Sequence, residues 1–248
     1  RIPLLVGCII IPFLLRLRSS LEESDEFSAR KHHPSLGEIM RSLASNAGLV
    51  AIGMMLFTMT TVSFYMITAY TPTFGSAVLH LPNMDSLIVT FCVGASNLLW
   101  IPLMGAFSDR IGRIPLLIGC TVLMLATAYP TMVWLVGAPS FTKLLAVELW
   151  LSFIYGSYNG AAIVFMTEII PITVRTLGFS LAYSFATAIF GGFTPAISTY
   201  LIHRTGNRAV PGLWLSMAAA SGLIATLLAR KRHQRAEVAM QGRPATAV

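Results

Sequence analysis

The chain has 248 residues, of which 55% are hydrophobic and only 11% are charged. Soluble domains carry roughly a quarter charged residues, so this composition excludes a soluble domain with a polar surface. The formal net charge of +7 comes from basic residues that lie between apolar stretches, which is typical of a protein that crosses a membrane several times.

Long stretches without Asp, Glu, Lys or Arg divide the chain into apolar segments. A helix needs about 20 predominantly apolar residues to cross about 30 Å of hydrocarbon. We expect Pro72 and Pro82 to end the second helix and to form an outer loop. The pattern predicts an all-α polytopic membrane protein with helices at 2–17, 48–71, 86–107, 114–136, 144–167, 176–201 and 211–229.

The first apolar run stands at the beginning of the chain. It starts at Arg1 rather than Met and enters an apolar stretch at once, without the cleavage site of a signal peptide, so we expect further residues upstream. The hydrophilic segment 18–47 should link this first helix to the other six. Within it, residues 35–44 have apolar residues at helical spacing and predict a short helix along the membrane surface.

Basic residues predict the orientation of the chain in the membrane. Segments 18–47, 108–113, 168–175 and 230–248, placed on one side, collect most of them. The opposite side then carries only Arg1, Lys143, Arg204 and Arg208. By the positive-inside rule the first side is cytoplasmic. Topology and contact with anionic lipid explain the net charge, so we expect no nucleic-acid partner.

Polar side chains within the predicted helices fall on single helix faces and are candidates for a solute cavity. Intramembrane polar groups usually face protein or water-filled space. The alternative is that these groups join neighbouring helices by hydrogen bonds. The candidate cavity residues are Tyr65, Asn97, Glu148, Tyr155, Asn159, Tyr183 and Thr187.

Glu148 is the only acidic residue well inside a predicted helix. Two interpretations stay open for it. It is either a proton carrier, which requires burial of the carboxyl group, or a structural cap near the outer end of the helix, which requires a partner such as Lys143.

Glycine and proline interrupt the sixth predicted helix at Gly191, Gly192 and Pro195. Proline in a membrane helix leaves carbonyl groups that neighbouring helices or water must satisfy. This segment is therefore a candidate hinge or binding segment, and the alternative is a static kink that serves packing.

Two short loops on the predicted cytoplasmic side carry charged motifs. Residues 105–113 fit the pattern G-x-x-x-D-R-x-G-R, in which Gly112 should permit a tight turn. Residues 168–178 combine an acidic residue, Pro, Arg and Gly. The charged residues either form an ionic latch that closes the cytoplasmic mouth or are ordinary helix-end charges. The candidate gate residues are Asp109, Arg110, Arg113, Glu168 and Arg175.

The first of these loops resembles the signature loop between the second and third helices of each half of the major facilitator superfamily. The second resembles the loop between the fourth and fifth helices. Longer strings, at 64–75, 147–153, 174–184 and 191–198, are similar to the citrate and tricarballylate branch of the metabolite:proton symporter family.

This resemblance implies a carrier of two six-helix bundles in a bacterial inner membrane, which imports citrate or a related carboxylate with protons by alternating access. The chain would then hold the last helix of the N-terminal bundle (1–17), the central cytoplasmic loop (18–47), the C-terminal six-helix bundle (48–229) and a basic tail (230–248). No Lys or Arg lies deep within a predicted helix, so the main charges that bind the anion should lie in a missing N-terminal half.

Three other functions are weighed against this one. The chain could carry another organic acid or a compatible solute, or it could be a membrane subunit that transports nothing. An intramembrane enzyme ranks last because the predicted helices hold no Ser/His, paired-Asp or metal-ligand constellation. We therefore expect no enzyme activity, no cofactor and no metal, with an organic acid, protons and the lipid bilayer as partners.

Overall fold

The computed structural model describes residues 10–20, 37, 41, 44–172 and 174–241. The chain forms two units, Arg1–Arg41 and Ser42–Val248, and each is described by itself. In the first unit, helix α2 (Ile10–Ser20) covers the second half of the predicted helix 2–17 and continues three residues beyond it. The predicted surface helix at 35–44 lies largely outside the described residues.

The described residues of the second unit form six long helical spans, and each is long and apolar enough to cross a membrane. This confirms the all-α polytopic fold. The first span joins α5 (Ala47–Phe64), η1 (Tyr65–Tyr70), α6 (Thr71–Thr73) and η2 (Phe74–Val78). Then follow α7 (Asn83–Ile111), α8 (Arg113–Gly137) and α9 (Phe141–Ile169). The fifth span joins α10 (Arg175–Ala186), η3 (Thr187–Gly191) and α11 (Thr194–Thr205), and the last span is α12 (Pro211–Gln241).

The first span is longer than predicted, because Pro72 does not end it. Pro72 stands in the first turn of α6, where its missing N–H group is tolerated, and the π-helical turns η1 and η2 flank it. In η2 the hydrogen bonds reach five residues, as in the bond from Leu79 N to Phe74 O at 3.0 Å. The prediction of an outer loop from Pro72 onward was therefore wrong. Isolated π-turns within membrane-length helices often mark functional segments.

The predicted basic tail begins as helix. Helix α12 passes the expected end at residue 229 and continues to Gln241. Arg, Lys, Gln, Ala and Glu dominate this extension, and these are strong helix formers that need no apolar surroundings. The part of α12 that is long and apolar enough to cross a membrane is Pro211–Arg232, whose last three residues are basic.

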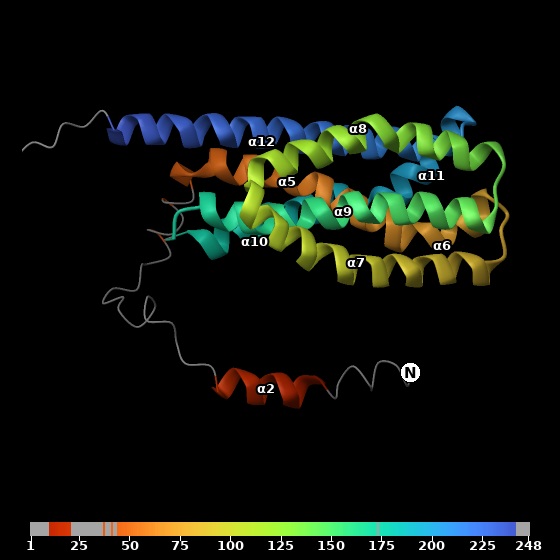
Figure 1. The fold of residues 1–248 in the computed structure, drawn as a ribbon, viewed down its shortest axis with the longest axis horizontal. Helices are drawn as coiled ribbons and strands as arrows, with labels where there is room; N and C mark the ends of the chain where they lie inside the picture. The colour runs from red at the N-terminus through yellow and green to blue at the C-terminus, as the bar shows by residue number, and fades with distance from the viewer. Residues whose placement is uncertain (1–9, 21–36, 38–40, 42–43, 173, 242–248) are drawn as a thin grey trace, which may run out of the picture. The chain divides into compact units, whose positions relative to one another are not determined.

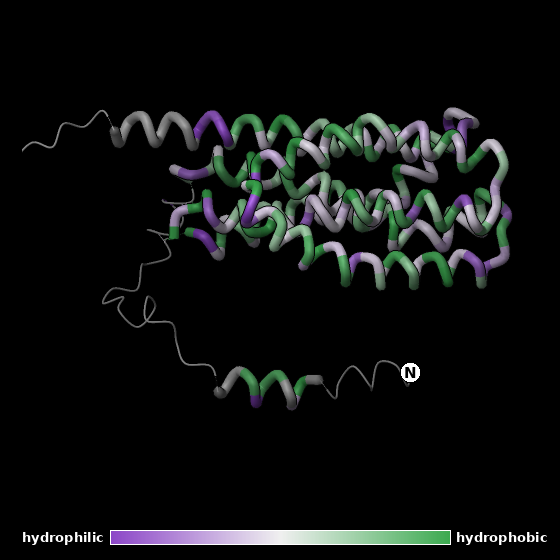
Figure 2. The backbone as a smooth tube through the Cα atoms, in the orientation of Figure 1, coloured by the Kyte–Doolittle hydropathy of each residue, from purple (hydrophilic) through white to green (hydrophobic). Residues whose placement is uncertain are grey.

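Helix α9 is the central helix of the bundle and has the largest buried share among the six spans. It packs against α7 and α8, while α12 packs against α8 and α5, and α5 packs against α10 (Figure 1). Figure 2 shows apolar residues along the middle of the helices and hydrophilic residues gathered toward their ends. Helices α7 and α10–α11 have the smallest buried shares, so they leave broad faces uncovered.

Glycines permit a close helix contact between α7 and α9. A β carbon at Gly160 would lie 2.6 Å from the main-chain oxygen of Ile101 and 2.9 Å from the main-chain nitrogen of Gly105. A β carbon at Gly156, one turn earlier on α9, would lie 2.8 Å from Cβ of Trp100. The spacing Gly156-x-x-x-Gly160 is that of small-residue contacts between membrane helices.

Gly112 forms the whole connection between α7 and α8. Its backbone has φ of +91° and ψ of 149°, a region that is essentially restricted to glycine. This agrees with the tight turn predicted from the motif. The substitution Gly112→Ala should lower the free energy of unfolding by about 1–3 kcal/mol, the cost of a strained backbone position. Thermal unfolding in detergent measures the change.

The matched control for this substitution is Gly119→Ala on α8. Beyond the backbone of its own helix turn, no atom lies within 4 Å of a β carbon built at Gly119, so the added methyl group should be neutral or slightly stabilising. Equal thermal stability of the two variants would contradict the assignment of strain to the turn.

Candidate functional site

One guanidinium group joins the α7–α8 turn to the end of α9. Arg113 donates from Nη2 and Nε to Oε1 of Glu168 at 3.2 and 3.4 Å. Its Nη1 pairs with Asp109 and donates to the hydroxyl of Ser108. A cavity of about 250 Å³ adjoins the Arg113–Glu168 pair. The network connects α7, α8 and α9, which favours a latch over isolated helix-end charges.

The other two candidate gate residues stand outside this network. Arg175 donates from Nε to the main-chain carbonyl of Ile170 at 3.4 Å, which holds the turn between α9 and α10. Arg110 is exposed and makes no ion pair within the part of the chain that the structure describes. Ser108, in contrast, is a buried member of the network that the sequence motif did not single out.

The latch should have a measurable but moderate effect on transport. Its two carboxylates are more than half exposed, at 61% for Asp109 and 51% for Glu168, and exposed ion pairs contribute about 0.2–1 kcal/mol. In a transport-competent carrier that contains this chain, Asp109→Asn should therefore lower initial uptake about two- to fivefold. The amount of inserted protein should not change.

The same chemical change at Asp85, in the first turn of α7, is the control for the latch. Asp85→Asn should leave uptake unchanged because this carboxylate lies at the opposite end of α7 from Asp109. Full uptake by Asp109→Asn would reduce the network to helix-end charges.

Glu148 lies in the interior of the bundle, in the first half of α9. It is 1% exposed, and its Oε2 has no hydrogen-bond partner among the described residues. The side chain of Thr71, in the short helix between the two π-turns, lies next to it. An ionised carboxylate is costly to enclose without a cation, whereas the neutral acid is tolerated.

Lys143 is not the partner of Glu148, although it stands near the start of the same helix. Its ammonium group lies 4.9 Å from the centre of the Trp134 ring. Within the described ranges it makes no ion pair with Glu148. The structure therefore does not support the interpretation of Glu148 as a cap that pairs with Lys143.

Some of the polar residues on the predicted faces have hydrogen-bond partners inside the bundle. Thr61 donates to the main-chain carbonyl of Phe57 at 3.0 Å, which is the usual bond of a helical threonine. Ser152 on α9 donates to Oδ1 of Asn97 on α7 at 2.8 Å. Asn97 thus joins two helices, as the packing interpretation expects.

The three candidate tyrosines belong to two groups of contacting rings on α5, η1, α9 and α10, one around Phe64 and the other around Phe57, which together are called the aromatic cluster. The ring centre of Phe64 lies 5.6 Å from that of Tyr65 and 6.0 Å from that of Tyr155. The ring centre of Phe57 lies 5.3 Å from that of Tyr183, and Tyr183 is 39% exposed. The phenylalanines that connect the tyrosines were missed in the sequence, because a phenylalanine in an apolar helix carries no signal of its own.

Two candidate residues beside this cluster keep unpaired oxygen atoms. Asn159 follows Tyr155 by one turn on α9, and Thr187 follows Tyr183 by one turn at the start of η3. Oδ1 of Asn159 and Oγ1 of Thr187 are buried without a hydrogen-bond partner among the described residues. A buried unpaired polar group costs about 1–3 kcal/mol. These two atoms are therefore positions that a solute or water could satisfy.

The interrupted segment of the fifth span lies against the same cluster. A β carbon at Gly191 would lie 2.9 Å from Cβ of Thr61, so this glycine brings η3 close to α5. Gly192 donates its N–H to the carbonyl of Thr187 at 2.7 Å, a five-residue bond that closes the π-turn. Pro195 follows in the first turn of α11. The predicted break in the helix is thus present.

Residues 14–230 match the model of the family described as "Sugar (and other) transporter". The chain belongs to this family of the major facilitator superfamily. It is 51% identical over 243 residues to a citrate-proton symporter of Salmonella typhi and 54% identical over 241 residues to one of Klebsiella pneumoniae. These matches cover 98% and 97% of this chain, and they confirm the resemblance inferred from the sequence.

A more distant relative is a glycine betaine/proline/ectoine/pipecolic acid transporter of Dickeya dadantii, 26% identical over 232 residues. The chain spans about half the length of the curated relatives it matches, with 56% and 54% of the two citrate-proton symporters covered. No solved structure matches the chain. The six apolar spans and these bacterial relatives identify a multi-pass integral protein of the inner membrane.

Proposed function

We propose that this chain forms one half of a proton-coupled carrier for citrate or a related carboxylate, which works by alternating access. The observation that carries the proposal is the identity of 51–54% to two citrate-proton symporters along nearly the whole chain. The betaine and proline carriers are only 26–27% identical over a similar length. A compatible-solute carrier is therefore the second candidate.

The aromatic cluster is the proposed solute contact of this half. Tyrosine hydroxyl groups and the amide of Asn159 can donate hydrogen bonds to carboxylate oxygens, and Thr187 adds a further hydroxyl. Charged donors would strengthen such binding, but the bundle interior holds no Lys or Arg among the buried residues that the structure describes. We propose that the second half of the carrier supplies them.

Glu148 is the proposed proton site of this half. The enclosed carboxyl group, its unpaired oxygen and the neighbouring π-turns together favour a role in which Glu148 gains and loses a proton as the helix rearranges.

Gly191, Gly192 and Pro195 are the proposed hinge beside the solute contact. Carriers of this kind bind solute near the membrane midplane, between two halves that rock against each other.

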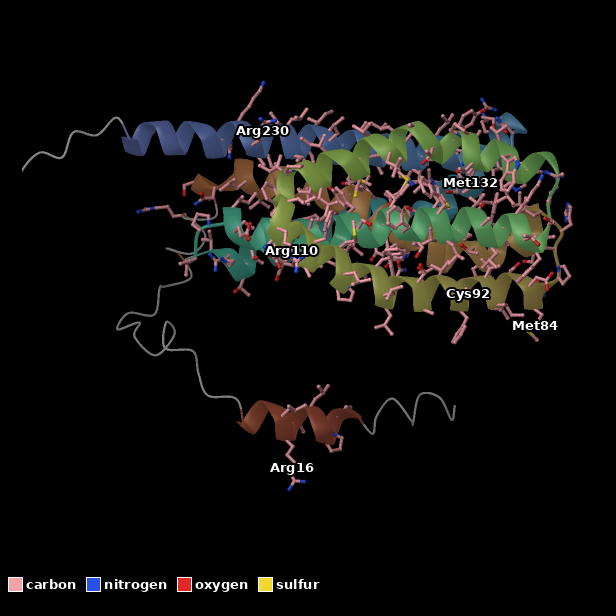
Figure 3. The ribbon with its side chains drawn as sticks, viewed as in Figure 1. Arg16, Met84, Cys92, Arg110, Met132 and Arg230 are labelled. Carbon is pink, nitrogen blue, oxygen red and sulfur yellow. The ribbon has the colours of Figure 1, made fainter. Side chains whose placement is uncertain are left out.

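The uncovered faces of α7 and α10–α11 are the proposed contact with that second half. Phe91 and Leu98 on α7 are 78% and 80% exposed in this chain, and Phe193 beside α11 is 60% exposed. Met84, which Figure 3 labels, lies on the same helix α7.

We propose that the latch faces the cytoplasm, that 18–47 is the central loop and that 230–248 is a cytoplasmic extension.

A chimera tests the proposed substrate class. This chain would replace the matching half of the Klebsiella pneumoniae citrate-proton symporter. The chimera would be placed in membrane vesicles, and a pH gradient would be imposed across their membrane. We expect saturable uptake of labelled citrate that a protonophore abolishes, and no uptake of labelled glycine betaine. Betaine uptake without citrate uptake would favour the second candidate. Neither uptake, with the chimera correctly inserted and the parent active, would contradict the proposal.

A further inference from the structure

A second cavity lies at the end of the bundle that also carries the latch. It has a volume of about 510 Å³ and lies between the start of α5 and the end of the apolar part of α12. Figure 1 shows these two helix segments side by side at that end. Four residues of α5 and three of α12 line it, namely Gly48, Ala51, Ile52, Met55, Leu228, Lys231 and Arg232.

The helices separate at this cavity after a close contact. Ser221 on α12 donates its hydroxyl to the main-chain carbonyl of Met55 at 3.1 Å. A β carbon at Gly222 would lie 3.2 Å from Cβ of Met59. These contacts fix α12 against α5 next to the cavity, so the space is bounded by two firmly packed helices.

Both charged groups of the cavity are cationic. Lys231 and Arg232 make no ion pair within the described part of the chain. The guanidinium group of Arg232 lies over the first turn of α5, since a β carbon at Gly48 would lie 2.5 Å from its Nη2. That turn contains no acidic residue, and the positive end of a helix dipole adds to the local field.

The remaining walls are apolar and open toward the membrane. Leu228 is 42% exposed and its neighbour Leu227 is 41% exposed, and Ala51 is exposed on the facing helix. The cationic side chains therefore lie at the end of the membrane span, and exposed apolar side chains lie next to them. This is the arrangement of an anionic phospholipid, with a phosphate at the surface and acyl chains below it.

We propose that the cavity between α5 and α12 binds an anionic phospholipid, with its phosphate at Lys231 and Arg232 and an acyl chain along Leu228 and Ala51. The proposal does not depend on which solute the protein carries. It differs from the general attraction of basic residues to a membrane, because it requires these two side chains and the space between the helices.

Native mass spectrometry of the chain in detergent, with phosphatidylglycerol or phosphatidylethanolamine added, tests the site. The wild type should retain phosphatidylglycerol in preference to phosphatidylethanolamine. Lys231→Gln and Arg232→Gln should each weaken retention about fivefold, the factor for about 1 kcal/mol per basic residue near an anionic surface. Ala51→Trp, which keeps both cations and fills the apolar wall, should also weaken it.

Arg230→Gln is the matched control. Arg230 is exposed, does not line the cavity and, at 100° per residue, lies about 200° around the helix from Leu228. This variant should retain phosphatidylglycerol like the wild type. Equal loss in Arg230→Gln, or unchanged retention in Ala51→Trp, would overturn the site in favour of general surface charge. Displacement of the lipid by millimolar inorganic phosphate would overturn it in favour of a free-anion site.

Discussion

Glu148→Gln is expected to abolish proton-driven accumulation of citrate in the transporting chimera while citrate exchange continues. Glutamine has nearly the shape of the neutral acid but cannot release a proton. The buried position beside Thr71 would thus stay uncharged throughout the transport cycle. A gradient of one pH unit corresponds to about a tenfold accumulation per coupled proton, so the accumulation ratio should fall from about ten to about one. Counterflow of labelled citrate measures the exchange that remains.

The control for Glu148 is again Asp85→Asn, which removes a carboxylate from the same end of the bundle without touching its interior. This variant should accumulate citrate like the unmodified chimera. Tenfold accumulation by Glu148→Gln would remove Glu148 from the coupling mechanism. Loss of both accumulation and exchange in an inserted protein would assign it a structural role instead.

Gly160→Ala should clearly lower the stability of the bundle. The added β carbon would meet main-chain atoms of Ile101 and Gly105 at 2.6 and 2.9 Å, and a main chain cannot move aside as the end of a side chain can. Overpacking of this kind costs about 1–3 kcal/mol. Thermal unfolding in detergent should show a clearly lower midpoint, and the separated α7 and α9 should also strain the bond between Ser152 and Asn97.

Gly94→Ala on α7 is the matched control for this prediction. It adds the same methyl group at a position where no atom beyond the backbone of its own helix turn lies within 4 Å, so it should be neutral or stabilising by up to about 1 kcal/mol. A midpoint for Gly160→Ala equal to that of Gly94→Ala would contradict the close approach of α7 and α9.

The helices could be predicted from the sequence because charged residues mark the ends of membrane spans. Prediction failed at Pro72, since no local pattern shows that neighbouring π-turns will accommodate a proline within a continuing helix. It also failed at residue 229, where the helix was expected to end with the apolar segment. A helix rich in Arg, Lys and Ala can continue beyond the membrane into water. The turn at Gly112 was predictable because a one-residue connection requires a backbone that only glycine adopts readily.

The candidate site was predictable only in part. Residues 109, 113 and 168 lie at helix ends that the predicted topology places on one side of the membrane, so their meeting could be expected from the sequence. The contact of Glu148 with Thr71 does not, because it depends on how α9 packs against a distant, interrupted helix. The pairing of Asn97 with Ser152 has the same origin. Polar periodicity identifies a helix face, but the partner of that face is a property of the packed bundle.

Proton-driven citrate uptake by three sets of vesicles tests most directly whether this bundle is one half of a two-bundle carrier. One set would contain this chain alone, the second this chain with a separately expressed N-terminal half of the Klebsiella pneumoniae relative, and the third no protein. Because solute binds between two halves in such carriers, uptake should occur only in the second set. Robust uptake by this chain alone would contradict the account and would require two copies to form a complete transporter.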